Sequence, residues 1–242
     1  MPRMHDESAP PPPPRLVRQP PRGRVLVFAP HPDDEAAGPG GTLALHRRQG
    51  DAVRVVIVTD GRNGDADHLY EPQAYAAMRA GESRRGLAEL GIDDVVFWGL
   101  PDGHVPSEAD LAAARARAVA ELASFQPDIV YLPWQREGHP DHHSLHRIGM
   151  QALAAFGFRG LGLGYEIWST LLPEILVDIS PVIDRKTAAM RAHASQLELV
   201  RFDRGLLGLA EYRSLVHMRG KGHGEAFVIL SGSWPGPADD AV

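Results

Sequence analysis

The stretch RVLVFAPHPDDEAAGPGG, residues 24–41, joins an apolar run directly to a histidine and three acids. The run at 24–30 predicts a buried strand, because short continuous apolar segments are typical of strands covered on both faces. His31, Asp33, Asp34 and Glu35 then follow within five positions. Carboxylates this close repel one another unless a positive charge lies among them. We therefore expect a positively charged partner at the end of this strand.

Strands and helices alternate along most of the chain. Strands are expected at 24–30, 52–61, 94–100 and 127–133, and helices at 40–50, 72–91, 107–125 and 142–157. This alternation is typical of a mostly parallel sheet with helices on both faces. The sequence therefore predicts a single-domain α/β protein with a three-layer, Rossmann-like fold.

The C-terminal third has a weaker pattern. Segments 165–171 and 174–180 predict two strands, with a hairpin around residues 172–173 as one arrangement. A helix is expected over 181–199, and a last strand over 226–231.

Composition limits the kinds of protein that this chain can be. Its 242 residues suit one domain at 24–232, between a proline-rich segment at 1–23, expected to be disordered, and a flexible tail at 233–242. A formal charge of −6 argues against nucleic-acid binding. No membrane-spanning run or signal-peptide core is found, so a cytoplasmic protein is expected; the composition leaves the oligomeric state open. Without cysteine, metal ligands must come from His, Asp or Glu, and the chain has 12 histidines.

Polar side chains follow all four of the first predicted strands. Segments 31–35, 60–63, 101–104 and 134–142 each begin where a strand ends. In open parallel sheets the carboxyl ends of the strands lie at one edge, and ligands bind there. The sequence therefore predicts a ligand site at this edge.

A dinucleotide site is the first alternative, because glycines follow the first strand. Gly38, Gly40 and Gly41 fit part of a G-x-G-x-x-G pattern, but Leu43 stands where its third glycine belongs. The acidic loop would also repel a pyrophosphate. NAD(P) binding is therefore disfavoured.

A zinc site fits these residue types better. A histidine and a carboxylate three residues apart on a tight loop can occupy two corners of a tetrahedral zinc, and EGHPDHHSLH at 137–146 can supply a third. A nearby carboxylate that is not a ligand can accept a proton from water. His142 and His146 are four residues apart and form an alternative pair. The residues alone therefore leave the third ligand open.

These two segments resemble the signature of the LmbE/PIG-L-type zinc de-N-acetylases, which remove acetyl groups from N-acetylglucosamine-like sugars. That family carries His-Pro-Asp-Asp-Glu after the first strand and a later His-Pro-Asp-His. Here they are PHPDDE at 30–35 and GHPDHH at 138–143. The similarity covers roughly residues 24–230 and includes the weaker segments RAGESRRGLAELG, LPDG and AHASQ.

The resemblance implies roles for the matching residues of the two segments. His31, Asp34 and His142 would bind zinc, with iron(II) as an alternative metal. Asp33 would be the general base. His139 would stabilise the oxyanion or protonate the leaving amine.

Further residues receive roles with less support from the motifs. Asp141 would orient the neighbouring catalytic histidine, and Arg79 and Asp102 match positions that hold sugar hydroxyls or phosphate-like groups. Trp134 would stack on a sugar face or pack its loop. Glu137 stands where some relatives carry a tyrosine, and it would affect acid–base assistance or the charge preference for substrate.

The predicted function is hydrolysis of an N-acetyl group on an amino sugar or glycoconjugate, a small-molecule substrate, with release of acetate and a free amine. An amidase of the same family acting on a larger amide is one alternative. A non-catalytic sugar-binding protein with a relict metal site is another. The intact Asp33 argues against the second alternative, because binding needs no general base.

Overall fold

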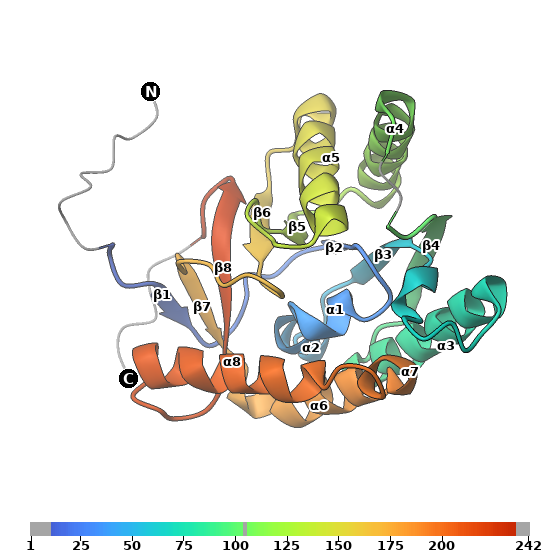
Figure 1. The fold of residues 1–242 in the computed structure, drawn as a ribbon. Helices are drawn as coiled ribbons and strands as arrows, with labels where there is room; N and C mark the ends of the chain where they lie inside the picture. Colours follow the sequence, from blue (N-terminus) through green and yellow to red (C-terminus); the bar gives the residue numbers. More distant parts are fainter. Residues whose placement is uncertain (1–10, 104–105, 236–242) are drawn as a thin grey trace.

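Strand β2, Val25–Ala29, is formed by the apolar run of the opening stretch and lies inside the sheet. All five of its side chains are buried, because helices cover both faces of the sheet (Figure 1). The computed structural model describes residues 11–103 and 106–235. None of the described helices is long and apolar enough to cross a membrane.

The elements follow one another as listed here. They are β1 (Arg15–Val17), β2 (Val25–Ala29), α1 (Asp34–Ala37), α2 (Gly40–Arg48), β3 (Val53–Thr59), η1 (Arg62–Gly64), α3 (Pro72–Leu90), β4 (Asp94–Leu100), α4 (Glu108–Phe125), β5 (Ile129–Pro133), α5 (Pro140–Phe156), β6 (Leu161–Tyr165), β7 (Ile175–Asp178), η2 (Ser180–Val182), α6 (Ile183–Arg191), α7 (Ala194–Leu197), α8 (Phe202–His217) and β8 (Gly224–Ser231).

Within the described residues, eight strands form one sheet in the order β1-β7-β8-β6-β5-β2-β3-β4, and only β8 runs antiparallel to its neighbours. The chain passes from β2 to β3 and β4, then returns to the other side of β2 through β5. Ligands of open α/β sheets bind where the strand order reverses in this way. The switch point of this protein therefore lies between the carboxyl ends of β2 and β5.

The protein has three layers, which confirms the predicted fold class. Helices α4 and α5 cover one face of the sheet, while α2, α3, α6 and α8 lie on the other (Figure 1). Alternate residues of β2 serve the two cores: Val25 and Val27 face the larger helical layer, and Leu26 and Phe28 pack toward α4 and α5. The rigid sheet thus fixes the loops that leave its carboxyl edge.

The glycines after β2 serve close packing. A Cβ on Gly38 would lie 2.5 Å from the ring of Tyr165, and one on Gly41 would lie 2.8 Å from Ile179. Only glycine lets this turn approach the sheet and η2 so closely. The packing gives these glycines a role that needs no dinucleotide.

Part of the segment expected to be disordered at 1–23 is ordered. Strand β1 pairs in parallel with β7, and the Arg15 N–H donates to the Glu174 carbonyl at 2.8 Å. The short Arg-Leu-Val run interrupts the prolines and supplies a buried Val17, which explains the edge strand. Residues 1–10, and residues 236–242 of the predicted C-terminal tail, lie outside the described residues.

The C-terminal third differs most from the prediction. The expected hairpin is wrong, because β6 and β7 both pair with β8 and not with each other. The predicted strand at 165–171 is a loop after its first residue, and the predicted helix at 181–199 is divided into η2, α6 and α7. Helix α8 was not predicted, since Gly205 and Gly208 weaken its helical pattern.

Candidate active site

The predicted site residues converge at the switch point of the sheet. His31 follows β2, and His139 and His142 lie at the start of α5, which follows β5. Among the described residues, two groups of three place one donor atom each within 4.8 Å of one another: His31, His139 and His142, and His31, Asp102 and Asp141. Three segments far apart in the sequence thus meet at one edge.

Asp34 lies between His31 and His142. Its Oδ2 lies 3.0 Å from His31 Nδ1 and 3.1 Å from His142 Nε2. His142 is fully buried, and neither of its ring nitrogens makes a hydrogen bond of good geometry within the described residues. In a tetrahedral zinc site, neighbouring ligand atoms lie about 3.3 Å apart. Asp34 belongs to neither group of three, but its donor type, its two short distances and the unsatisfied imidazole fit a divalent cation.

Asp33 has a strained backbone, with φ 148° and ψ −28°. Its N–H donates to Glu35 Oε2 at 2.9 Å, and its Oδ2 accepts from Arg79 Nη2 at 2.8 Å. Burial raises the pKa of Asp33 to about 6; the Arg79 charge opposes this rise, and Asp34 adds to it. A carboxylate in this range suits a general base near neutral pH.

Arg79 lies behind the loop and is only 3% exposed. Besides Asp33, its guanidinium donates to the Pro32 carbonyl at 2.9 Å and the Gly61 carbonyl at 2.7 Å. Arg79 therefore holds the loop through these bonds. Its predicted contact with a substrate stays a prediction.

His139 caps α5, where its Nδ1 accepts the N–H of Asp141 at 3.2 Å. A ring nitrogen that accepts carries no proton, so the proton of the neutral ring lies on Nε2. Burial lowers the pKa of His139, and the charges of His31 and His142 lower it further. His139 is therefore arranged as a neutral donor through Nε2.

Asp141 contacts His139 through its backbone, and its carboxylate points elsewhere. The Oδ2 atom accepts from the Gly103 N–H at 3.0 Å and lies 3.2 Å from His31 Nε2. Burial favours a higher pKa for Asp141, but the bonds to His31 and Gly103 outweigh it and hold the pKa to about 2. The carboxylate therefore faces His31, whereas the sequence predicts that Asp141 orients His139, which it contacts through its backbone N–H.

Asp102 also faces His31. Its Oδ1 lies 3.2 Å from His31 Nε2, while its Oδ2 accepts the Asn63 N–H at 3.0 Å. This position lies beside the histidines, at the predicted edge. His146 turns away from them, since its Nδ1 is bonded to the Pro133 carbonyl at 2.8 Å. The alternative pair of His142 and His146 is therefore not brought together at this centre.

Glu137 and Trp134 are less available to a substrate than predicted. Glu137 is 5% exposed, and its Oε2 lies 3.2 Å from His142 Nδ1. Burial favours a higher pKa for Glu137, but the contact with His142 and two backbone N–H donors lower it overall. The half-buried Trp134 donates from Nε1 to the Ser169 carbonyl at 2.8 Å and packs against a small apolar cluster. The indole therefore packs its loop, which was the other predicted role.

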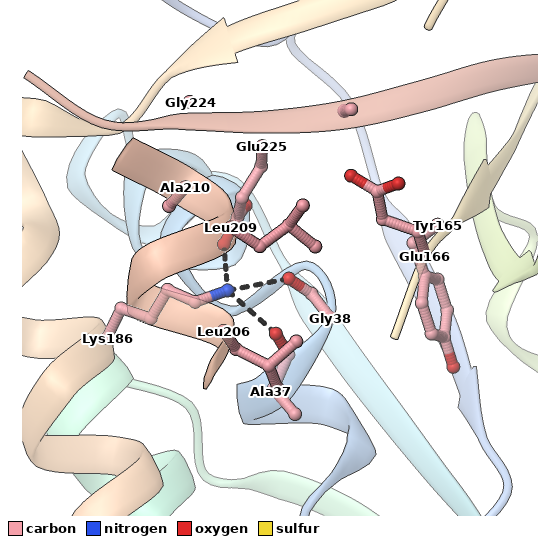
Figure 2. Close-up of a pocket in the computed structure, with 11 residues that line it drawn as sticks. Ala37, Gly38, Tyr165, Glu166, Lys186, Leu206, Leu209, Ala210, Gly224 and Glu225 are labelled. Carbon is pink, nitrogen blue, oxygen red and sulfur yellow. Dashed lines mark hydrogen bonds and ion pairs between the residues drawn. The ribbon is translucent and has the colours of Figure 1, made fainter. Parts of the chain in front are cut away.

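Sequence reasoning missed a buried support for the acidic loop. Lys186 donates to the carbonyls of Ala37 and Gly38 at 2.9 and 2.7 Å and pairs with Glu225 at 2.5 Å (Figure 2). The Glu225 carboxylate also accepts the N–H of Thr42 at 2.7 Å. A cavity of about 20 Å³ beside this pair has room for one water. These contacts join α6 and β8 to α1 and α2, and a lysine inside an amphipathic helix gave no signal of them.

The two donor groups predict different results for two substitutions. We expect His142→Ala to lose most of its bound metal, because the unsatisfied imidazole faces Asp34. Asp102→Ala should keep its metal and show a lower kcat/KM, since Asp102 is already bonded to the Asn63 backbone. Metal content after dialysis distinguishes the two variants. The reverse pattern would place the ion between His31, Asp102 and Asp141.

Fold and site together define a Rossmann-like α/β protein with a candidate metal centre and an adjacent buried carboxylate at the sheet edge. The chain belongs to the PIG-L family, described as GlcNAc-PI de-N-acetylases, whose model matches residues 26–153. This match confirms the resemblance drawn from the two motifs.

Relatives of this chain are similar to it over most of its length. A 1D-myo-inositol 2-acetamido-2-deoxy-alpha-D-glucopyranoside deacetylase of Mycobacterium sp. (strain JLS) is 30% identical, over 89% of this chain and 86% of its own. A diacetylchitobiose deacetylase of Thermococcus kodakarensis is 30% identical, over 72% and 70% of the two chains. The solved N,N'-diacetylchitobiose deacetylase of Pyrococcus horikoshii has a TM-score of 0.74 at 26% identity, covering 86% and 84%.

Proposed function

We propose that this protein is a metal-dependent hydrolase that removes the N-acetyl group from an N-acetylglucosamine-type sugar or glycoconjugate. The observation that carries the proposal is Asp33, a carboxylate beside the candidate ligands that is bound to Arg79 and not placed between the histidines. A family of deacetylases and relatives that act on acetamido sugars support the same reaction.

His31, Asp34 and His142 would hold the metal, which we take to be zinc, with iron(II) as the alternative. When bound, a divalent cation of this kind acts as a Lewis acid toward the acetyl carbonyl and makes water more acidic. The scissile amide of the substrate would lie at the carboxyl edge of the sheet, between β2 and β5.

The remaining steps belong to the side chains. Asp33 accepts a proton from the attacking water as its oxygen bonds to the carbonyl carbon. His139 donates its Nε2–H to the oxyanion; loss of one such donor typically costs about 3–4 kcal/mol of barrier. The carbon–nitrogen bond then breaks, and the amine leaves with the proton that Asp33 took from water and now returns. The products are acetate and a free amino sugar.

A screen of N-acetylated amino sugars tests this function. We expect metal-stripped protein to be inactive, and zinc- or iron-loaded protein to release acetate and free amine in equal amounts. The panel should include N,N'-diacetylchitobiose and an N-acetylglucosaminyl inositol, because relatives are named for those substrates. Amine release from larger amides without acetate would instead indicate an amidase. Sugar binding without any turnover by the loaded protein would contradict the proposal.

A further inference from the structure

The carboxylate of Glu137 contacts both a candidate metal ligand and a neighbouring loop. Glu137 lies between β5 and α5, and its Oε2 is 3.2 Å from His142 Nδ1. The same carboxylate accepts three consecutive backbone N–H groups, from Ile167 at 2.8 Å, Trp168 at 3.1 Å and Ser169 at 3.2 Å. Both oxygens are therefore occupied within the protein.

We propose that Glu137 is a positioning residue that orients His142 for the metal and couples metal binding to the order of loop 166–174. The inference rests on the proposed function, since it concerns the same metal centre. A carboxylate facing Nδ1 of a ligating histidine fixes the proton on that nitrogen and leaves Nε2 free to bind metal. In His142, Nε2 is the atom that faces Asp34.

Loop 166–174 is the second partner of the Glu137 carboxylate. Loop 166–174 follows β6, whose carboxyl end lies at the same edge as those of β2 and β5. It carries Trp168 and Leu172, which are 56% and 73% exposed. One carboxylate lies 3.2 Å from the His142 ring and also accepts the loop amides. Metal binding that fixes the ring should therefore also fix the acceptor of these amides. Metal binding should therefore protect these amides, and loop disorder should weaken metal binding.

Glu166 offers a matched control. It is buried like Glu137 and accepts a backbone N–H from the same loop, that of Leu171, at 2.8 Å. Within the part of the chain that the structure describes, its other side-chain hydrogen bonds are with Arg213, and none is with His142. A carboxylate that only holds the loop and one that also orients the histidine can thus be compared within one protein.

The test compares zinc affinity in wild type, Glu137→Gln and Glu166→Gln, using competition with a chromophoric chelator. Glutamine keeps the side-chain shape but presents at most one acceptor oxygen. We expect Glu137→Gln to bind zinc about 10–100-fold more weakly, the usual cost of losing such a partner. Glu166→Gln should stay within about twofold of wild type. Circular dichroism establishes that each variant is folded.

Hydrogen exchange gives a second measurement that needs no variant. In wild type, adding zinc should slow exchange at the amides of Ile167, Trp168 and Ser169. The inference is overturned by wild-type protein that binds no zinc, by unchanged exchange at these amides, by wild-type affinity in Glu137→Gln, or by an equal loss in Glu166→Gln. Neither measurement uses a substrate, so a failed deacetylation screen would contradict the proposed function and leave this result standing.

Discussion

Asp33→Asn is expected to lower kcat by about 10²–10⁴-fold while the protein keeps its metal. Asparagine has nearly the same shape as aspartate, but it cannot accept the proton of the attacking water. Asp33 is bound to Arg79, whereas the ligand candidates His31 and His142 both face Asp34. Steady-state kinetics and metal content measured on the same preparation test both halves of this expectation.

Asp34→Ala is the matched control for Asp33→Asn. Its loss of activity should follow a loss of metal, and excess zinc should restore part of the rate. Excess zinc should not restore Asp33→Asn. Because that substitution removes the counter-charge of a buried Arg79, thermal unfolding should establish that the variant is folded at the assay temperature. Normal turnover by Asp33→Asn, or metal loss equal to that of Asp34→Ala, would contradict this division of roles.

The centre of the fold could be predicted because its signals are local. The apolar run at 24–30 is buried on both faces in β2, and the polar segments after the strands meet at one edge because parallel strands share their direction. His31 and His142 come together for the same reason, although 111 positions separate them. Alternation was sufficient to place both segments at this edge, and the resemblance to the family favoured His142 over His146.

The contacts of Arg79, Glu137 and Asp141 could not be predicted in the same way. Each is a charged residue near a motif, and sequence alone favours solvent or substrate as its partner. Their actual partners are backbone groups and side chains brought together by packing: Arg79 binds carbonyls of two loops, and Glu137 binds amides 30 or more positions away. These side chains find protein partners because they are buried, and their burial depends on how the helices pack on the sheet.

The C-terminal third was least predictable because its partners follow from strand order. Strand β6 contains Gly162 and Gly164, which remove the usual apolar signal, and β7 has only four residues. A hairpin around residues 172–173 was the simplest local arrangement for segments 165–171 and 174–180. Strand β8, which comes last, instead lies between β6 and β7 and pairs with both. It also brings Glu225 to Lys186.

Lys186→Met is expected to destabilise the protein by about 3–5 kcal/mol, the typical cost of leaving one partner of a buried ion pair alone. Lys186 is 2% exposed, and its ammonium group binds Glu225 and the carbonyls of Ala37 and Gly38. Methionine matches the length of the lysine chain but leaves the Glu225 carboxylate buried without its cation. Urea unfolding, followed by circular dichroism, measures the loss.

The chain provides its own control, since its second lysine, Lys221, is exposed. Lys221→Met should change stability by less than about 0.5 kcal/mol.

A second test adds Glu225→Gln to Lys186→Met. Removing both charges leaves no uncompensated ion in the core. The double variant should therefore lose less free energy of unfolding than the two single variants lose together, by about 0.5–3 kcal/mol. Because Lys186 and Glu225 bind the turn between α1 and α2, Lys186→Met should also weaken zinc binding through Asp34, which begins α1. A Lys186→Met protein within 1 kcal/mol of wild type would show that other contacts fix the acidic loop.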